Sequence, residues 1–475
     1  MPAPGPGFSL TLSVRDQESM DPLARIVPAL SLHGGRLAAA LPLPDGSLAI
    51  TVYCRDLPHQ QEILTSLRGI PGLTSTGLQD DVFALHRGGK LQMSSTSPLK
   101  SAADLARQYT PGVARICRSI AKVPDRARIL TQRRNLVAVV SDGSAILGLG
   151  NLGPAAALPV MEGKAILFKE FGGVDAFPIV LASQDMEEIV ATVTQIAPSF
   201  AGINLEDISA PRCFAIEDRL KNTLDIPVFH DDQHGTAIVV LAAIQNACRV
   251  TGKDFSRLRV VVLGVGAAGT ACIRLLTKAG VGEIIGVNRG GSIFSGKPGL
   301  SESNLELAKI TNPRRVEGGV VEALAGADVF LGLSGPNLLP LAGVKAMAPD
   351  PIVLAMSNPD PEIDPEVVRP WVAVLATGRS DYPNQVNNVL AFPGLFRGAL
   401  DAGATQITGG MCLAASAAIA SLAERDGVNR ENIIPNPLDR RVAPAVAEAV
   451  AEAARQDGVA RDFPPVPGID ELSDC

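Results

Sequence analysis

The sequence predicts an α/β protein whose largest part is a doubly wound, mainly parallel sheet. Strand-like and helical segments alternate between residue 257 and about residue 400, which is the order that parallel strands with crossover helices require. A glycine-rich turn follows the first of these strands. Of the 475 residues, 46% are hydrophobic and only 19% are charged, as expected for strands buried on both faces. The length allows two or three domains.

The first ninety or so residues have a different order of elements. Strands are predicted at residues 8–14, 36–41, 47–54 and 72–78, with more extended chain at 81–86. Helices are predicted from Asp21 and Pro22, after the first strand, and at 59–67, after the third. This βαββαβ order indicates a small α+β domain over residues 1–95, because a glycine- and serine-rich linker ends it. Such a unit serves either in regulation or as a passive dimerisation arm.

The rest of the chain is expected to form two further domains and a tail. Residues 96–235 predict an α/β domain with strands at 136–141 and 165–168. The doubly wound sheet belongs to the third domain, residues 236–460, which Ala-rich helices close. The proline-rich residues 461–475 predict a tail that is loose or packs on a second subunit.

The glycine-rich turn has the spacing of a dinucleotide-binding site. It consists of Gly264, Val265, Gly266, Ala267, Ala268 and Gly269. The turn follows the apolar strand 258–263 and opens a helix at 270–278, so a helix N-terminus faces the pyrophosphate of NAD(P) in a Rossmann-type domain. The next strand ends in Asn288 and Arg289, where an acid normally holds the ribose of NAD. We therefore expect NAD to be used and NADP to be tolerated.

Three carboxylates at the ends of two apolar strands predict a metal site. Glu206 and Asp207 follow the first strand, and Asp232 follows the second. Carboxylates are hard ligands, which favours Mg²⁺ or Mn²⁺. His230 and His234 flank Asp232 and raise zinc as an alternative, but the acid-rich set favours the hard cation.

Several runs, taken in their order along the chain, resemble the malic enzymes. The runs are Tyr109-Thr110-Pro111-Gly112-Val113-Ala114, Ser141-Asp142-Gly143-Ser144, Gly148-Leu149-Gly150-Asn151-Leu152-Gly153, Met161-Glu162-Gly163-Lys164, Asp231-Asp232-Gln233-His234-Gly235-Thr236, Ser357-Asn358-Pro359 and Asn387-Asn388 before Phe392-Pro393-Gly394. This family oxidises and decarboxylates malate to pyruvate with NAD(P) and a divalent cation. The resemblance covers roughly residues 108–454, and it implies malate and pyruvate as substrate and product. The N-terminal unit resembles the ACT-type regulatory fold found ahead of some bacterial members, so we expect a small-molecule effector there.

The resemblance also implies roles for single residues. Lys164 is the expected base for the C2 hydroxyl of malate, and the apolar run that follows it predicts a lowered pKa. Tyr109 is the expected acid that protonates enolpyruvate at C3. Asn358, Asn387 and Asn388 lie where the asparagines of the family meet nicotinamide, ribose and the malate carboxylate.

The cation that holds the second carboxylate of malate is less evident. Ser144 stands where some relatives carry an arginine after Asp-Gly, so the nearby Lys169 is the alternative. Asp231 precedes a predicted metal ligand, and we expect it to support that ligand from outside the metal's own shell.

Two other functions are open from the residues alone. A dehydrogenase of amino or hydroxy acids would share the domain plan without decarboxylation, and a catalytically silent metabolite sensor would work through its N-terminal unit. The three carboxylates argue against the first, because such dehydrogenases need no chelated cation. The presence of Tyr109, Lys164 and the metal ligands argues against the second.

Composition also bounds the partners. A net charge of −7 and a pI near 5.4, without a basic stripe, disfavour nucleic acid and anionic membranes. The 7 cysteines are scattered and never spaced as CxxC, and the N-terminus has no apolar leader, which favours the cytoplasm. A homodimer or a larger homo-oligomer is expected.

Overall fold

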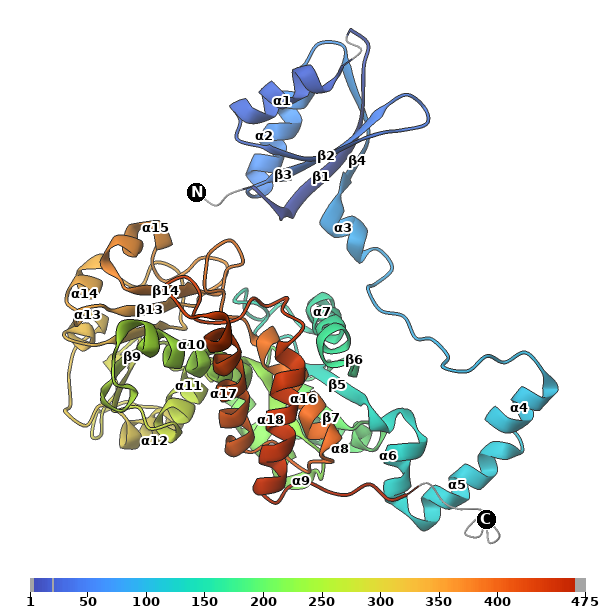
Figure 1. The fold of residues 1–475 in the computed structure, drawn as a ribbon, viewed down its shortest axis with the longest axis vertical. Coiled ribbons are helices and arrows are strands. Elements are labelled where there is room, and N and C mark those ends of the chain that lie inside the picture. Colours follow the sequence, from blue (N-terminus) through green and yellow to red (C-terminus); the bar gives the residue numbers. More distant parts are fainter. Residues whose placement is uncertain (1–3, 19–20, 466–475) are drawn as a thin grey trace. The chain divides into compact units, whose positions relative to one another are not determined.

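The computed structural model describes residues 4–18 and 21–465. The chain forms two compact units, which divide between Gln92 and Met93 (Figure 1). The division lies three residues before the boundary expected at residue 95. The boundary expected between residues 235 and 236 falls inside the second unit, and most of the expected tail, residues 466–475, lies outside the described residues.

The N-terminal unit is a four-stranded antiparallel sheet with strand order β2-β3-β1-β4. Its strands and first two helices are β1 (Gly5–Asp16), α1 (Leu23–Leu32), β2 (Arg36–Pro42), β3 (Leu48–Cys54), α2 (Leu57–Arg68) and β4 (Leu73–Asp80). Alternate side chains of β1, Leu10, Leu12 and Val14, are buried against Ile26 of α1 and Ile63 of α2. The predicted βαββαβ order is thus confirmed, with both helices packed on one face of the sheet (Figure 1).

Residues 81–86 are helical, so the extended chain predicted there is wrong. The helix α3 (Asp81–His86) begins after Asp80. The Asp80 carboxylate accepts hydrogen bonds from the backbone N–H groups of Val82 (3.0 Å) and Phe83 (3.1 Å). An N-cap of this kind satisfies two of the free N–H groups of the first turn, and it outweighs the strand propensity of the short apolar run.

The second unit begins with two helices, α4 (Ala102–Gln108) and α5 (Gly112–Lys122), and then reaches a parallel sheet through α6 (Ala127–Leu130). Figure 1 shows α4 and α5 extending away from this sheet. The sheet has the order β6-β5-β7-β8. Its strands and the helices that connect the later ones are β5 (Leu136–Ser141), β6 (Asp175–Val180), α8 (Met186–Ile196), β7 (Gly202–Leu205), α9 (Arg212–Thr223) and β8 (Val228–His230).

The helix α7 (Pro154–Gly172) connects β5 to β6 and contains residues 165–168, so the strand predicted there is wrong. Its buried residues are Ala157, Met161, Ala165, Phe168 and Gly172. They are spaced by three or four positions, which is the period of an amphipathic helix rather than of a strand. The short window from Ala165 to Phe168 showed a continuous apolar run and concealed the longer period.

The larger sheet is the predicted doubly wound one, with order β11-β10-β9-β12-β13-β14. All neighbouring strands of this sheet run parallel, except that the short edge strand β11 pairs antiparallel with β10. Its elements are β9 (Arg259–Leu263), α11 (Ala267–Lys278), β10 (Glu283–Asn288), β11 (Gly291–Ser292), α12 (Glu302–Ile310), α13 (Val320–Leu324), β12 (Val329–Gly332), α14 (Leu341–Lys345), β13 (Ile352–Ala355), α15 (Pro365–Val368) and β14 (Val374–Thr377). The strand order reverses between β9 and β12, where such sheets bind their ligands.

Four helices join the two parallel sheets into one core. These are α10 (Thr236–Thr251), α16 (Phe392–Asp401), α17 (Gly409–Asp426) and α18 (Val442–Gln456), and the last two include the predicted Ala-rich helices. The helices α16, α17 and α18 pack on one another, and α10 packs on α17. A single hydrophobic cluster includes Val137 of β5, Ile244 of α10 and Val260 of β9. The two sheets of this unit are therefore held by shared apolar packing.

Candidate active site

The three predicted metal ligands lie together at one edge of the smaller sheet. Glu206 and Asp207 follow β7, and Asp232 lies in η4 (Asp231–Gly235), the turn that follows β8. The strands β7 and β8 are parallel neighbours, so their carboxyl ends share an edge. One carboxylate oxygen from each of the three residues lies within 4.8 Å of the other two. The structure therefore brings together the set that the sequence proposed.

The electrostatics of this cluster fit a divalent cation. Asp207 Oδ2 is buried and has no hydrogen-bond partner among the described residues, while the Asp207 backbone N–H donates to Asp232 Oδ2 at 2.8 Å. Burial, together with the neighbouring Asp232, raises the pKa of Asp207 to about 7. Carboxylates crowded in this way repel one another unless a positive charge joins them. The donor set is all oxygen, which suits Mg²⁺ or Mn²⁺ better than zinc.

Lys164 reaches the same cluster from α7. Its ammonium lies 2.6 Å from Asp231 Oδ2 and 3.0 Å from Glu206 Oε1, and its side chain is 11% exposed. The nitrogen also lies 4.5 Å from the centre of the Phe392 ring. Burial alone would lower the pKa of Lys164, but the carboxylates of Asp231 and Glu206 reverse this and raise it. The lowered pKa expected from the apolar flank is therefore wrong for this arrangement, because two acids that are distant in sequence face the amine.

Asn388 joins this network from a distant part of the sequence. Its amide donates to Asp231 Oδ2 at 3.2 Å, and its carbonyl oxygen accepts from the Thr236 hydroxyl at 3.2 Å. Asn387, one residue earlier, accepts from the backbone N–H of Val389 and caps the short helix η7 (Asn388–Leu390). Asp231 is thus held by Lys164 and Asn388 together, as expected for a residue that supports a site from outside the metal's own shell.

The dinucleotide turn has the predicted form. Gly264 has φ +100°, a conformation that L side chains rarely adopt, and any Cβ at Gly269 would meet the carbonyl oxygen of Gly264. The turn from Gly264 to Gly269 therefore joins β9 closely to the N-terminus of α11. At the end of β10, the side chain of Asn288 accepts from the backbone N–H of Gly290 at 2.8 Å. Asn358 lies after β13, close to Gly378.

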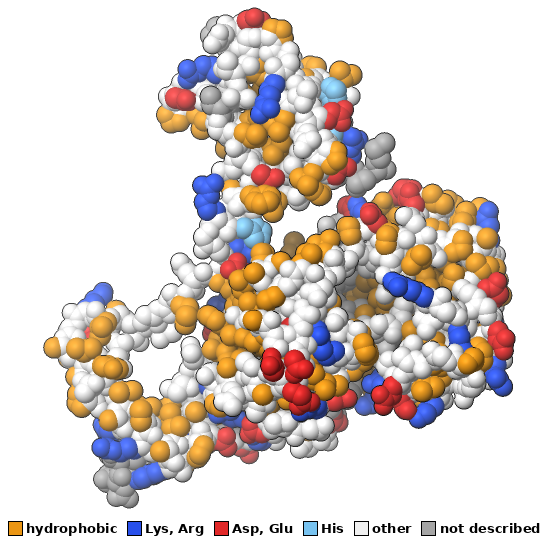
Figure 2. All heavy atoms as spheres, turned by 180° about the vertical axis from the view of Figure 1, so that it is seen from behind, with side chains coloured by type: hydrophobic (Ala, Val, Ile, Leu, Met, Phe, Trp, Pro, Cys, Tyr) orange, Lys and Arg blue, Asp and Glu red, His pale blue; other side chains and the backbone are white. Residues whose placement is uncertain are grey.

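Tyr109 is not part of this cluster within one chain. It is the C-terminal cap of α4 and is 67% exposed, and its hydroxyl has no hydrogen-bond partner among the described residues. The helix α5 that follows carries Val113, Ile116 and Ile120 at helical spacing, and Ser119 is its one buried residue in the described chain. Figure 2 shows hydrophobic side chains gathered along these two helices. The arm that carries Tyr109 thus has an uncovered apolar face.

Comparisons with known proteins agree with this geometry. The model of the N-terminal domain of malic enzymes matches residues 88–221, and the model of the malic enzyme NAD-binding domain matches residues 233–455. The chain belongs to the malic enzyme family. It is a decarboxylating oxidoreductase that converts malate to pyruvate with NAD(P), and a divalent metal is typical of its family.

The relatives include malic enzymes named as NAD-dependent and, as in Escherichia coli (48% identical over 78% of this chain and 51% of its own), as NADP-dependent. An NAD-dependent malic enzyme from Geobacillus stearothermophilus is 50% identical over 98% of both chains. A bifunctional malic/malolactic enzyme from Bacillus subtilis is 52% identical over 81% of this chain and 95% of its own. The crystal structure of the NAD-dependent malic enzyme from Thermotoga maritima aligns with a TM-score of 0.76 and 47% identity, over 78% of this chain and 99% of the other. No helix in the described part of the chain is long and apolar enough to cross a membrane.

Three polar residues of this malic enzyme were not expected from its sequence. Glu217 of α9 is buried and accepts from Gln233 (3.0 Å) and from His234 (3.0 Å). Burial would raise the pKa of Glu217, but His234 and Lys221 hold it well below its ordinary range. His234 thus pairs with Glu217 and does not join the metal ligands. Only the spacing of Glu217 along an amphipathic helix, on its buried face, signals this role.

Arg212, at the start of α9, is the second such residue. Its guanidinium donates to Asp142 Oδ2 at 2.5 Å and to the Ser144 hydroxyl at 2.9 Å, and Ser144 is itself bonded to the backbone N–H of Ser209. Ser144 is therefore part of a buried network beside the site. Lys169, proposed as the cation for the second carboxylate, is 60% exposed at its side chain and pairs with Asp175 at 2.7 Å. The structure does not bring Lys169 to the site.

Glu362 is the third. It is fully buried, and its carboxylate accepts from the backbone N–H groups of Ser334 (3.0 Å) and Ser357 (3.1 Å), which follow β12 and β13. Burial raises the pKa of Glu362, while these two N–H groups oppose the rise. Any Cβ at Gly332 would collide with this carboxylate. Glu362 thus holds two loops of the dinucleotide crevice, one of which carries Asn358.

Proposed function

We propose that Lys164, the carboxylates of Glu206, Asp207 and Asp232, and Tyr109 of a second copy together perform the oxidative decarboxylation of (S)-malate. The observation that carries the proposal is the position of the Lys164 ammonium between Asp231 and Glu206, beside the three-carboxylate set. An amine in this place faces the metal ligands and can serve a substrate that binds against them. The supported reaction consumes malate and NAD and yields pyruvate, CO₂ and NADH.

Each residue has one part in this reaction. A cation bound to Glu206 would offset one of the charges that raise the pKa of Lys164. Lys164, as the free amine, would then take the proton of the C2 hydroxyl, while NAD would accept the hydride from C2. Glu206, Asp207 and Asp232 would hold a Mg²⁺ or Mn²⁺ ion, and this ion would supply Lewis acidity to the substrate oxygens. The C4 carboxylate, which is β to the new C2 carbonyl, leaves as CO₂, and the electron pair of its bond to C3 forms the enolate. Tyr109 then donates a proton to C3 and so gives pyruvate.

The product analysis separates this reaction from oxidation alone. The full chain with malate, NAD and Mn²⁺ at neutral pH is expected to release pyruvate and NADH in equal amounts. Oxaloacetate that accumulates in place of pyruvate would support a dehydrogenase that does not decarboxylate. No reduction of NAD or NADP under these conditions would contradict the proposal.

The exposure of Tyr109 supports its delivery by a second subunit. A catalytic acid must reach the substrate, yet Tyr109 lies on the arm of α4 and α5, whose apolar side chains Leu105 (48% exposed) and Ile116 (38% exposed) are uncovered. An apolar helix face of this kind needs a partner. In a twofold dimer each arm would lie against the other copy, so each site would combine Lys164 of one chain with Tyr109 of the other.

Hybrid dimers test this arrangement sharply. Co-expressed Tyr109→Phe and Lys164→Ala chains, each nearly inactive alone, are expected to recover about a quarter of the wild-type rate, since half of the dimers are hybrids with one intact site. The matched control joins wild-type chains with the double variant Y109F/K164A, whose hybrids should then contain no intact site. If Tyr109 acts within its own chain, the first mixture stays inactive and the hybrids of the control keep one working site.

The choice of cofactor is proposed to depend on the end of β10. Asn288 binds the backbone of Gly290, and Lys297 donates to the Gly290 carbonyl oxygen at 2.7 Å, which places a cation beside this turn. With no acid at position 288, nothing there repels a 2′-phosphate, and Arg289 can pair with one. Asn288→Asp is expected to lower kcat/KM for NADP by more than about tenfold and to spare NAD. Retained NADP activity would show that this turn does not read the ribose.

The N-terminal unit is proposed to regulate catalysis, because the residues assigned to the chemistry all lie in the second unit. Deleting residues 1–92 should leave malate oxidation measurable. Amino acids, dicarboxylates and acyl-CoA compounds are then compared for their effect on KM in the full and shortened chains. An effector response that needs residues 1–92 supports regulation, and a response that survives the deletion places it elsewhere. Absence of any response supports a passive dimerisation arm.

A further inference from the structure

A cavity of about 190 Å³ lies between α9, η4, α11 and α17, apart from the residues that the reaction uses. Phe229 and Ile407 form part of an apolar floor. Lys221, Arg274 and Lys278 line it, and no Asp or Glu is among its lining residues. Positive side chains around a small apolar floor are the features of a site for an anion with a compact body.

Two of the three cations lack an acidic partner. Arg274 and Lys278 make no ion pair within residues 4–18 and 21–465, whereas Lys221 lies 2.6 Å from Glu217. Arg274 and Lys278 are also four positions apart on α11, so their like charges repel each other on one helix face. A dianion placed between them would relieve this repulsion.

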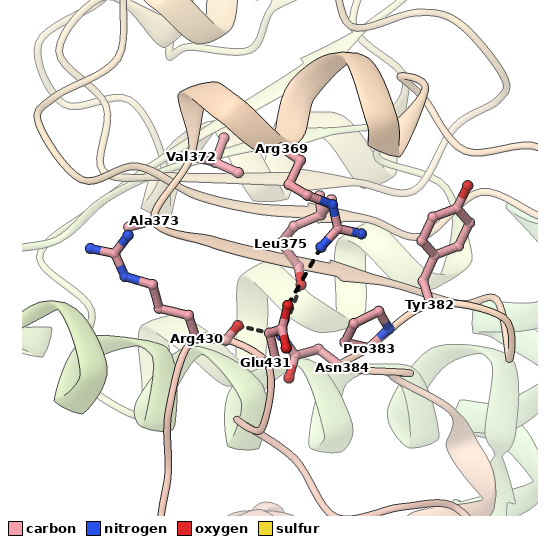
Figure 3. Close-up of a pocket in the computed structure, with 9 residues that line it drawn as sticks. All are labelled: Arg369, Val372, Ala373, Leu375, Tyr382, Pro383, Asn384, Arg430 and Glu431. Carbon is pink, nitrogen blue, oxygen red and sulfur yellow. Dashed lines mark hydrogen bonds and ion pairs between the residues drawn. The ribbon is translucent and has the colours of Figure 1, made fainter.

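Another cavity of similar size, about 180 Å³, shows what a matched set of charges looks like. Figure 3 shows Arg369 turned toward Glu431, and these two groups lie 3.8 Å apart. The second arginine of that cavity, Arg430, lies 3.9 Å from Asp350. Its cations are thus already paired with carboxylates of the chain. The cavity between α11 and α17 differs because its positive charge is in excess.

A helix N-terminus adds to this positive charge. The helix α17 begins at Gly409, and its cap Thr408 lines the cavity. The Lys278 ammonium lies so close to Gly409 that any Cβ there would collide with it. Asp457 accepts a hydrogen bond from the Thr408 hydroxyl and offsets part of the charge at this end, but it does not line the cavity. The first N–H groups of a helix have no acceptor within it and attract anions.

We propose that this cavity binds a small dianion, of the phosphate or dicarboxylate class, and that the bound dianion lowers KM for malate. The cavity shares two elements with the active site. The helix α11 begins at the dinucleotide turn, and η4, which supplies Gln233 and His234 to the cavity, also contains Asp231 and Asp232. A ligand that joins α11 to η4 therefore stabilises the arrangement of the dinucleotide and metal parts relative to each other.

Direct titration tests the binding. Inorganic phosphate and, separately, succinate are titrated calorimetrically into the full chain and into R274Q/K278Q, with R369Q/R430Q of the other cavity as the matched control. The double change on α11 should weaken the binding of at least one probe by about tenfold or more, and the control should leave it unchanged. The probe that loses affinity identifies the class of dianion. Equal binding by all three proteins, or equal loss in both variants, overturns the proposal.

The kinetic measurement tests the coupling and is the one part that rests on the proposed function. With NAD as cofactor, phosphate or succinate should lower KM for malate at least about twofold in the full chain and in R369Q/R430Q, but not in R274Q/K278Q. Arg274→Gln alone, at an exposed position, should give an intermediate response if the double variant folds poorly. Binding at this cavity without a change in KM overturns the coupling. Because calorimetry needs no turnover, an inactive enzyme would leave the binding result intact.

Discussion

Lys164 and Tyr109 were assigned neighbouring steps of one reaction, yet the chain presents them in opposite ways. Lys164 is 11% exposed at its side chain and is fixed by Glu206 and Asp231, which directly follow the strands β7 and β8 of the same unit. Tyr109 is 67% exposed, and its hydroxyl has no hydrogen-bond partner among the described residues. One half of the site is thus assembled by the fold of a single chain, and the other half depends on what covers the arm of α4 and α5.

This difference separates two kinds of prediction from sequence. A motif predicts which residue acts, but whether it acts within one chain depends on packing far from the motif. Lys164 is packed within one chain, because its helix α7 covers the sheet that contains the strands β7 and β8. For Tyr109 the neighbouring helix α5 leaves its apolar side chains partly exposed, and Ser119 is its one buried residue in the described chain.

Loss of the amine should give the largest effect. Lys164→Ala is expected to lower kcat for malate oxidation by about a thousandfold or more, because it removes the base and leaves Asp231 and Glu206 facing each other without a cation. Lys169→Ala is the matched control, since Lys169 lies on the same helix but is exposed and pairs with Asp175. Comparable losses in both variants would remove the special role of Lys164.

Loss of a metal ligand should follow. Asp232→Ala is expected to lower the rate by about a hundredfold and to weaken Mn²⁺ binding measured by calorimetry, because one of three oxygen ligands is gone. Asp218→Ala changes an exposed acid of α9 and should alter neither quantity. Full activity of the wild-type protein in excess EDTA would contradict metal dependence altogether.

The tyrosine should matter for one step rather than for all. Tyr109→Phe is expected to slow the conversion of enolpyruvate to pyruvate by at least about tenfold, while Lys164→Ala affects this partial reaction less. Enolpyruvate generated in the assay by a second enzyme supplies the substrate. Equal defects of both variants in every partial reaction would mean that the two residues do not divide the proton transfers.

A weakened arm should make activity depend on protein concentration. Ile116→Ser removes apolar contact area from α5 without touching Tyr109, so the dimer should dissociate more readily and the specific activity should fall several-fold on dilution. Sedimentation at the same concentrations measures the dimer directly. An unchanged dimer with unchanged activity would show that this face of α5 is not the contact that completes the site.

The smallest expected effect is on stability, in the internal half of the site. The pKa of Asp207 rises from 3.8 to about 7 on folding, so its protonated form is favoured in the folded state. The contribution of this pKa shift to the free energy of unfolding of the metal-free protein is therefore fully present below about pH 4. This contribution is lost as the pH rises through about 7. The difference in free energy of unfolding between wild type and Asp207→Asn should change in this window. Added Mn²⁺ should restore stability at neutral pH, and a pH-independent difference would contradict the crowding of the carboxylates.

Much of the fold followed from local patterns. The doubly wound class of the larger sheet, the dinucleotide turn and the three carboxylates at strand ends were predicted, because each strand, turn and strand end leaves a local signal. The prediction of a strand at 165–168 was wrong, because a four-residue apolar window cannot distinguish the period of a helix from that of a buried strand. The raised pKa of Lys164 and the roles of Glu217 and Glu362 were beyond local reasoning, since their partners come from distant parts of the sequence.

The carboxylate of Glu362 links two loops of the dinucleotide crevice. The Glu362 carboxylate accepts hydrogen bonds from the backbone N–H groups of both Ser334 and Ser357. Because it joins the loops after β12 and β13, we expect these two loops to move together. The turn at Gly264 on the neighbouring strand is held differently: its N–H donates to the Val287 carbonyl oxygen at 2.9 Å, and it lies against Leu333 and Ser334. Entry and exit of the nicotinamide coenzyme should then move the two loops joined by Glu362 together, and Glu362→Gln should let them move more independently.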